Sequence, residues 1–262
     1  MSGETRGTLP EGEIATMKYL WLTLVLCIWL PSAQARPRVV AHRGGAALAP
    51  ENTMAAFHKA LALKADAIEL DIHPSGDGVL MVIHDETTKR TFHQEGVVSQ
   101  MTSLELELLG VPRLESVLEL CRGKCQVVIE IKHPHGARNP EVESKLSQLL
   151  QKREYQDDVI VISFDALSLK LLHKLRPELA TGYLFSELKE PEKLKAELGV
   201  RFLGPHHRLI TRDWLNKAHA VDLKVNAWTV NEADDLSRLA RWGVDYITTD
   251  RPDRLQQLLE SP

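Results

Sequence analysis

Charged side chains gather where three predicted strands of the chain end. The first apolar run, "RVVA", is followed by "HRGG", the second strand ends in "AIELDIHP", and the third in "VVIEIKHP". Because alternate residues of a strand share a face, the acidic pair of the second strand points to one side, and so do the acid and the lysine of the third. The residues of this cluster are His42, Arg43, Glu69, Asp71, Glu130 and Lys132.

Three members of this cluster, Glu69, Asp71 and Glu130, are carboxylates. Burying several like charges together is costly unless a positive group compensates them. A hard divalent cation with oxygen ligands is the natural partner, and Mg²⁺ and Ca²⁺ both suit such ligands. We therefore predict a metal site, while ion pairing within the protein is the alternative reading of the same residues.

Fixed cations and titratable groups accompany the carboxylates. Arg43 and Lys132 suit an anion such as phosphate, since an arginine can bind two of its oxygens. His42 and His84 titrate near neutral pH and could serve as base and acid on a phosphodiester. These residue types predict metal-assisted chemistry at a phosphoryl group.

The elements that position these residues alternate between strands and helices. This order favours a parallel sheet, and about eight such units predict a TIM (β/α)8 barrel, whose chemistry lies at the carboxyl ends of the strands. A doubly wound open sheet is the alternative, but the sequence has no glycine-rich nucleotide-binding loop. The predicted strands are 38–42, 67–73, 79–84, 126–132, 159–164, 181–185, 200–203, 223–229 and 245–248; the predicted helices are 53–63, 114–121, 141–153, 167–175, 192–198, 212–219, 232–242 and 254–260.

One strand breaks the alternation. Residues 79–84 follow the second strand through the turn sequence "PSGDG", which is too short for a crossover helix. We expect an antiparallel pair, with His84 carried over the barrel mouth and a small insertion over residues 85–111.

The ordered motifs of the chain resemble those of the glycerophosphodiester phosphodiesterases. They read "AHRGGAALAPENTMAAF", "ADAIELDIHPSGDGVLMVIHDETTKRT", "VVIEIK", "VISF", "AWTVN" and "RWGVDYITTD", and they span most of the chain. The resemblance implies a TIM barrel, a divalent metal, and hydrolysis of glycerophosphodiesters, such as glycerophosphocholine or glycerophosphoethanolamine, to sn-glycerol 3-phosphate and an alcohol.

Carried over to this sequence, the resemblance implies a role for each residue of the cluster. The metal ligands are Glu69, Asp71 and Glu130; the acid–base pair is His42 and His84; and the phosphate-binding residues are Arg43 and Lys132. Glu51 would orient the His-Arg turn, Asn52 or Thr53 would cap the next helix, and Trp228 would contact the glycerol unless it is a core aromatic residue.

Two further pairs of histidines flank predicted strands. We expect His133 and His135 to be solvated loop residues, with an extension of the site as the alternative. The same choice stays open for His206 and His207.

Two other functions compete with this interpretation. A lysophospholipase D or sphingomyelinase D-like enzyme would need access for an acyl chain, and the sequence shows no evident apolar lid. A catalytically inactive, phosphodiester-binding barrel would have lost a histidine or a metal ligand, and every expected position is filled.

Composition and the first 35 residues bear on location. The 262 residues are 44% hydrophobic and carry a net charge of −4 without a basic block, so nothing indicates nucleic-acid binding. Residues 1–16 look like a misassigned extension, and residues 17–35 read as a signal peptide cut after Ala35, with an uncleaved membrane anchor as the alternative. We expect a single domain over 36–262, without a membrane span and exported to the periplasm, with secretion as the alternative; its oligomeric state is left open.

The two cysteines of this domain, Cys121 and Cys125, lie four residues apart. We expect small buried thiols, and a disulfide is the alternative that an oxidising compartment permits.

Overall fold

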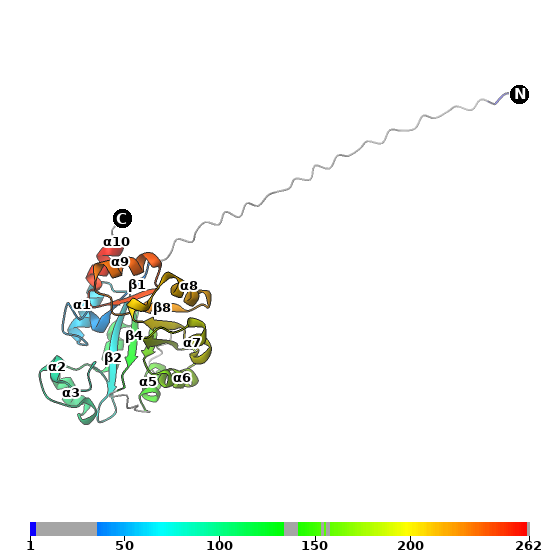
Figure 1. Ribbon diagram of the computed structural model, residues 1–262. Helices are drawn as coiled ribbons and strands as arrows, with labels where there is room; N and C mark the ends of the chain where they lie inside the picture. Colours follow the sequence, from blue (N-terminus) through cyan, green and yellow to red (C-terminus); the bar gives the residue numbers. More distant parts are fainter. Residues whose placement is uncertain (4–35, 134–140, 153–154, 156–157, 261–262) are drawn as a thin grey trace. The chain divides into compact units, whose positions relative to one another are not determined.

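The computed structural model describes residues 1–3, 36–133, 141–152, 155 and 158–260, and Figure 1 shows its ribbon. The predicted extension and signal peptide, apart from residues 1–3, lie outside the described residues, as does His135. Within the described ranges, no helix is both long and apolar enough to cross a bilayer.

Eight parallel strands close into a barrel, which confirms the predicted fold (Figure 1). Closure comes from β1, which pairs with both β2 and β9. The barrel strands are β1 (Arg38–Ala41), β2 (Ala67–Pro74), β4 (Gln126–Ile131), β5 (Val159–Ser163), β6 (Ala180–Phe185), β7 (Phe202–Pro205), β8 (Lys224–Ala227) and β9 (Tyr246–Thr249).

Helices alternate with these strands and cover the outside of the barrel. They bury apolar faces against it, while local signals set their ends: Thr53 caps α1, and Gly199 ends α7 in the left-handed conformation. The helices are α1 (Met54–Ala62), α4 (Leu114–Cys121), α5 (Val142–Lys152), α6 (Ala166–Leu175), α7 (Pro191–Leu198), α8 (Arg212–Ala220), α9 (Ala233–Trp242) and α10 (Pro252–Glu260).

The predicted insertion follows β2. Strand β3 (Leu80–Val82) pairs antiparallel with β2 outside the ring, as expected from the short turn between them. The insertion then forms α2 (Lys89–Phe92), the 3₁₀ helix η2 (Val98–Gln100) and α3 (Ser103–Leu109), which begins with a capping box. A small core of its own, around Met81 and Leu106, holds this unit together.

The predicted strands and helices that recur in the structure have ends within two residues of the prediction. Strand β7 shows the reason. The sequence predicts a strand from residue 200, but Gly199 has just ended α7 with a φ of +65°, so the chain first needs two residues to reach the sheet. Strand β7 therefore begins at Phe202.

The barrel interior changes character along its axis. Its amino-terminal half is filled by an apolar cluster, which includes Val40, Ala67 and Val128. Two residues further along β2 and β4, the same inward-facing register carries Glu69 and Glu130. The ionisable groups therefore lie at the carboxyl end of the barrel, above this apolar cluster.

Candidate active site

The three predicted metal ligands come together on two neighbouring strands. Asp71 of β2 lies directly opposite Glu130 of β4, and Glu69 stands one inward position earlier. One oxygen from each carboxylate lies within 4.8 Å of the others. The Oδ1 atom of Asp71 is buried and lacks a hydrogen-bond partner; Lys132 Nζ lies 3.6 Å from it, and Arg43 Nε lies 3.2 Å from the other oxygen, Oδ2. A set of oxygen donors with a buried atom of this kind fits a hard divalent cation.

The three buried carboxyl groups of the triad have shifted pKa values. Burial, followed by the charge of Asp71, raises the pKa of Glu69 to about 7 and the pKa of Glu130 to about 8. Burial also acts to raise the pKa of Asp71, but Lys132 and Arg43 outweigh it and lower that pKa. Burial and the charge of Asp71 therefore favour the protonated forms of Glu69 and Glu130, whereas a bound cation would favour their ionised forms.

The His-Arg turn is fixed by tight packing against α1. Gly44 has a φ of +83°, and a Cβ atom there would lie 2.7 Å from the Cβ of Ala56. The backbone nitrogen of Arg43 donates to Glu69 Oε2 at 2.9 Å, and Asn52 Nδ2 donates to Asp71 Oδ2 at 2.9 Å. The turn is thus bonded to the carboxylates of β2. Of the two residues considered as helix cap, Thr53 caps α1, while Asn52 supports the triad.

His42 is oriented by a residue that the sequence analysis did not single out. Its Nδ1 atom donates to Asp250 Oδ1 at 2.6 Å, and Asp250 Oδ2 accepts from Asn231 Nδ2 at 2.7 Å. Its Nε2 atom lies 3.9 Å from Glu69 Oε2. Burial acts to lower the pKa of His42, but the hydrogen bond to Asp250 and the charge of Glu69 prevail, and the pKa rises above its usual value.

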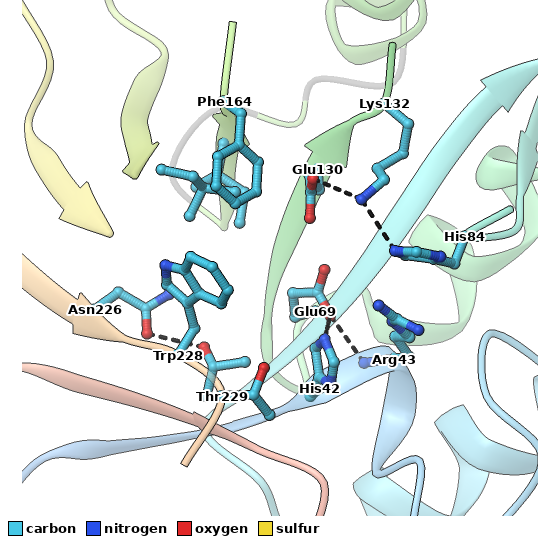
Figure 2. Close-up of a pocket in the computed structure, with 13 residues that line it drawn as sticks. His42, Arg43, Glu69, His84, Glu130, Lys132, Phe164, Asn226, Trp228 and Thr229 are labelled. Carbon is cyan, nitrogen blue, oxygen red and sulfur yellow. Dashed lines mark hydrogen bonds and ion pairs between the residues drawn. The ribbon is translucent and has the colours of Figure 1, made fainter. Parts of the chain in front are cut away.

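His84 lies on the other side of the triad, where the chain leaves β3 for the insertion. Its Nδ1 atom donates to Asp85 Oδ1 at 2.7 Å, and its Nε2 atom accepts from Lys132 Nζ at 3.1 Å. Lys132 Nζ also donates to Glu130 Oε1 at 2.9 Å, as Figure 2 shows. Burial lowers the pKa of His84, and the charge of Lys132 acts in the same direction. The two histidines thus have pKa values displaced in opposite directions, which suits groups with different roles in proton transfer.

Glu51 contacts Arg43, as predicted, and brings a further residue into the network. Its Oε1 atom accepts from Arg43 Nη1 at 3.0 Å. The guanidinium of Arg90, from α2 of the insertion, donates to both oxygens of Glu51 at 2.6 and 3.0 Å and to both oxygens of Asp85 at 2.6 and 3.1 Å. One side chain of the insertion therefore joins the partner of Arg43 to the partner of His84.

A pocket of about 140 Å³ opens at the carboxyl end of the barrel (Figure 2), and the charged or titratable residues that line it are His42, Arg43, Glu69, His84, Glu130 and Lys132. Trp228 forms part of its wall, and its indole nitrogen donates to the carbonyl of Gly204 at 2.7 Å. Its ring packs edge-on against Phe164 with centroids 5.3 Å apart. These two contacts hold the ring of Trp228 in place at the pocket wall. Asn226 and Thr248 also line this pocket and hydrogen-bond to each other at 2.8 Å.

The flanking histidines occupy different places. The prediction of a solvated loop is wrong for His133, whose side chain is 10% exposed and hydrogen-bonds through Nε2 to Ser168 Oγ at 2.7 Å. His206 packs edge-on against Trp228, and His207 is buried near Asp235. Neither of these two lines the pocket, although one supports its wall.

Both cysteines of the domain are free thiols in the structure. Cys121 is buried at the end of α4, as expected, and Cys125 is partly buried after the following turn.

The histidines, the cations and two carboxylates of the triad line one pocket at the mouth of a closed barrel, and Asp71 lies beside those carboxylates. This places the molecule among the barrel enzymes that hydrolyse phosphate diesters. Comparison with known proteins defines the class further. The model of the glycerophosphoryl diester phosphodiesterase family matches residues 42–254. A glycerophosphodiester phosphodiesterase of Caldanaerobacter subterraneus subsp. tengcongensis is 36% identical over 84% of this chain and 97% of its own length.

Solved structures agree with this match. A glycerophosphodiester phosphodiesterase of Agrobacterium tumefaciens is 30% identical, with a TM-score of 0.76 over 84% of this chain and 99% of that one. A phosphodiesterase of Oleispira antarctica, in complex with the product sn-glycerol-3-phosphate, is 26% identical, with a TM-score of 0.79 over 86% and 98% of the two chains. The present chain belongs to the glycerophosphoryl diester phosphodiesterase family, and its activity is that of a glycerophosphodiester phosphodiesterase.

Proposed function

We propose that this enzyme hydrolyses small, deacylated glycerophosphodiesters, such as glycerophosphocholine and glycerophosphoethanolamine, with the help of one divalent cation. The observation that carries the proposal is a pocket lined by two cations, two histidines and two carboxylates of the acidic triad, with the third carboxylate, Asp71, within 4.8 Å of the other two. The products are sn-glycerol 3-phosphate and the free alcohol. The Oleispira antarctica structure, which holds sn-glycerol-3-phosphate, supports the assignment of the phosphate product.

Glu69, Asp71 and Glu130 would hold the cation, and either Mg²⁺ or Ca²⁺ suits these ligands. Bound there, the cation would neutralise the triad and polarise a phosphate oxygen. Arg43 and Lys132 would stabilise the charge that builds up on the phosphoryl group.

Proton transfer falls to the two histidines on either side of the triad. One would accept the proton of the nucleophile, and the other would return a proton to the leaving alcohol. Asp250 holds Nδ1 of His42, and Asp85 holds Nδ1 of His84, so each ring keeps its Nε2 atom toward the pocket side. The nucleophile is either water or the neighbouring glycerol hydroxyl, and the second route would pass through a cyclic phosphate.

The ring of Trp228 would contact the glycerol within the enclosed pocket. Asn226 and Thr248 provide polar atoms beside it for the glycerol hydroxyls.

Release of sn-glycerol 3-phosphate from glycerophosphocholine tests the proposal directly. Activity should be lost in EDTA and return with Mg²⁺ or Ca²⁺. His42→Ala and His84→Ala should each lower kcat by about 10²–10⁴-fold while the protein stays folded, because each removes a proton-transfer group. His58→Ala, on the exposed face of α1, is the matched control and should leave activity unchanged. Near-normal turnover in either active-site variant would contradict these roles.

A lysophospholipase D activity is the competing function. It predicts faster turnover of lysophosphatidylcholine than of glycerophosphocholine by the same preparation. Folded protein that releases sn-glycerol 3-phosphate from no diester, with any metal, would contradict the proposed function.

We further propose export to the periplasm after cleavage behind Ala35. Support comes from the signal-like pattern of residues 17–35. Arg36, which would become the first residue, pairs with Asp66 at 2.7 Å and so belongs to the barrel domain. The intact mass of the protein from a periplasmic extract tests this: a chain that retains residues 17–35 would favour a membrane anchor instead.

A further inference from the structure

Two hollows share the walls that would hold the phosphate. The first is the enclosed pocket of about 140 Å³ that contains Trp228. The second is an open cleft of about 490 Å³ above the ends of β4 and β5. Glu130, Lys132 and Phe164 line both, so the two hollows meet at the phosphate-binding wall.

A phosphate diester has two arms that leave the phosphorus in different directions. If the glycerol arm enters the enclosed pocket beside Trp228, the other arm must leave past the shared wall. The open cleft is the space available to it. The enclosed pocket offers polar partners for hydroxyl groups, whereas the cleft has a different lining.

We propose that this cleft is a binding site for the alcohol arm and that it favours small cationic alcohols, such as choline and ethanolamine. This inference rests on the proposed function, because it names the second part of the same substrate.

The lining of the cleft combines apolar surface with a carboxylate. The Phe164 side chain is 46% exposed, and Leu167 at the start of α6 is 57% exposed. Between them in the sequence, Asp165 caps α6: its Oδ1 atom accepts from the Leu167 backbone nitrogen at 3.0 Å and its Oδ2 atom accepts from Ser168 Oγ at 3.1 Å. The Asp165 side chain is 25% exposed. An aromatic face and a carboxylate together are suited to an alkylated ammonium group, which has apolar methyl groups around a positive charge.

Lys132 lines the same cleft, but its ammonium group is engaged elsewhere. Its Nζ atom lies 2.9 Å from Glu130 Oε1 and 3.1 Å from His84 Nε2, on the side of the enclosed pocket, as Figure 2 shows. Because of these two contacts, Lys132 directs its charge at the phosphate position rather than at the end of the alcohol arm. At the cleft end, His133 Nε2 lies 2.7 Å from Ser168 Oγ and 3.4 Å from Asp165 Oδ2.

An acyl chain is a poorer fit to this lining. The acyl chain of a lysophospholipid is attached to its glycerol, so the acylated glycerol arm would have to enter the cleft in place of the alcohol arm. The chain would then cover the Asp165 carboxylate, and burying a charge against hydrocarbon is costly. A cationic headgroup instead gains from the same carboxylate.

Two diesters that share the glycerol phosphate but differ in their alcohol distinguish an effect on alcohol binding from an effect on catalysis. Glycerophosphocholine carries a cationic alcohol and glycerophosphoglycerol a neutral one. Asp165→Asn removes the charge and keeps a good helix cap, and Leu167→Lys adds a positive charge at the rim. Leu175→Lys, on the same helix, 50% exposed and outside the cleft, is the matched control.

We expect Asp165→Asn and Leu167→Lys each to lower kcat/KM for glycerophosphocholine by about two- to fivefold, mainly through KM, as partly exposed charge contacts do. The same two substitutions should lower kcat/KM for glycerophosphoglycerol by less than this. Leu175→Lys should lower kcat/KM for glycerophosphocholine by less than this. Equal losses with both diesters, or no loss with either, would overturn the cleft assignment. The wild-type enzyme could instead turn over lysophosphatidylcholine faster than glycerophosphocholine and lose that activity in Leu167→Lys. This result would overturn the assignment in favour of an acyl site. Absence of sn-glycerol 3-phosphate from every diester would refute the proposed function itself.

Discussion

Arg90 offers a sharp test of how the insertion takes part in catalysis. It lines neither hollow, yet its guanidinium bridges Glu51, which contacts Arg43, and Asp85, which contacts His84. We expect Arg90→Gln to lower activity by releasing both contacts at once, although every group that would touch the substrate remains in place.

The size of the effect follows from the number and exposure of the contacts. Four hydrogen bonds of 2.6–3.1 Å join Arg90 to two carboxylates, and two-pronged contacts of this kind are stronger than single ones. The Arg90 side chain is 50% exposed, however, so each contact is worth only ~1 kcal/mol. Loss of both contacts costs about 2 kcal/mol of transition-state stabilisation, which corresponds to about a thirtyfold loss in kcat/KM.

Initial rates of sn-glycerol 3-phosphate release, measured over a range of glycerophosphocholine concentrations, give kcat and KM for each variant. Arg90→Lys should recover only part of the activity, because an ammonium group cannot bridge two carboxylates in the way a planar guanidinium does. Lys89→Gln is the control: it removes a positive charge from the same helix, where Lys89 pairs with the exposed Glu95. An Arg90→Gln enzyme within twofold of wild type, or one no worse than Lys89→Gln, would refute the reasoning.

Three further predictions concern other parts of the site. Asp250→Asn should lower kcat more than about tenfold without unfolding the protein, because His42 loses the anion that holds its Nδ1 proton; an unchanged kcat would contradict this. Gly44→Ala should destabilise the fold by about 1–3 kcal/mol in urea unfolding, because its Cβ would meet α1 and its φ is positive; a change below ~0.5 kcal/mol would show that the turn can relax. Without metal, Glu69 and Glu130, with pKa values of about 7 and 8, bind more protons folded than unfolded, so stability should fall as pH rises from about 5 to 8. Added Mg²⁺ or Ca²⁺ should therefore raise Tm more at pH 8 than at pH 5, and equal shifts at both pH values would count against a cation at the triad.

The sequence predicts the barrel and the acidic triad because both follow from short-range regularities. Strand and helix alternation is visible in hydrophobic patterning, and a period of two places Glu69 and Asp71 on one face whatever else the chain does. The turn before β3 is likewise local, so the antiparallel hairpin and the insertion are predictable from a few residues.

Contacts that depend on how distant segments dock are not visible in this way. Arg90 lies 39 residues from Glu51, and as a half-exposed residue of a short helix it looks like any solvated arginine. His133 follows a strand and reads as a loop residue, but the packing of α6 brings Ser168 against it. Asp250 differs, since it follows β9 directly, and the strand-end rule that found the triad would have found it too.

The two sides of the barrel mouth carry different kinds of residue. The triad lies on β2 and β4, and the histidines and cations follow β1, β3 and β4; β1 and β4 are the neighbours of β2 in the ring. Phe164 directly follows β5 and Trp228 directly follows β8; neither is ionisable, and their ring centroids lie 5.3 Å apart.

This division has a physical basis. On β2 the outward-facing residues Ile68, Leu70 and Ile72 are fully buried in the outer core, so hydrophobic packing on one face holds the strand while its other face carries charges that cost stability. The groups that would act on the phosphate therefore depend on the rigid packing of one wall. The opposite wall contributes shape, apolar surface and the Asp165 carboxylate, and in the proposed cleft changes there would alter which alcohol is accepted while leaving the acidic triad and its histidines in place.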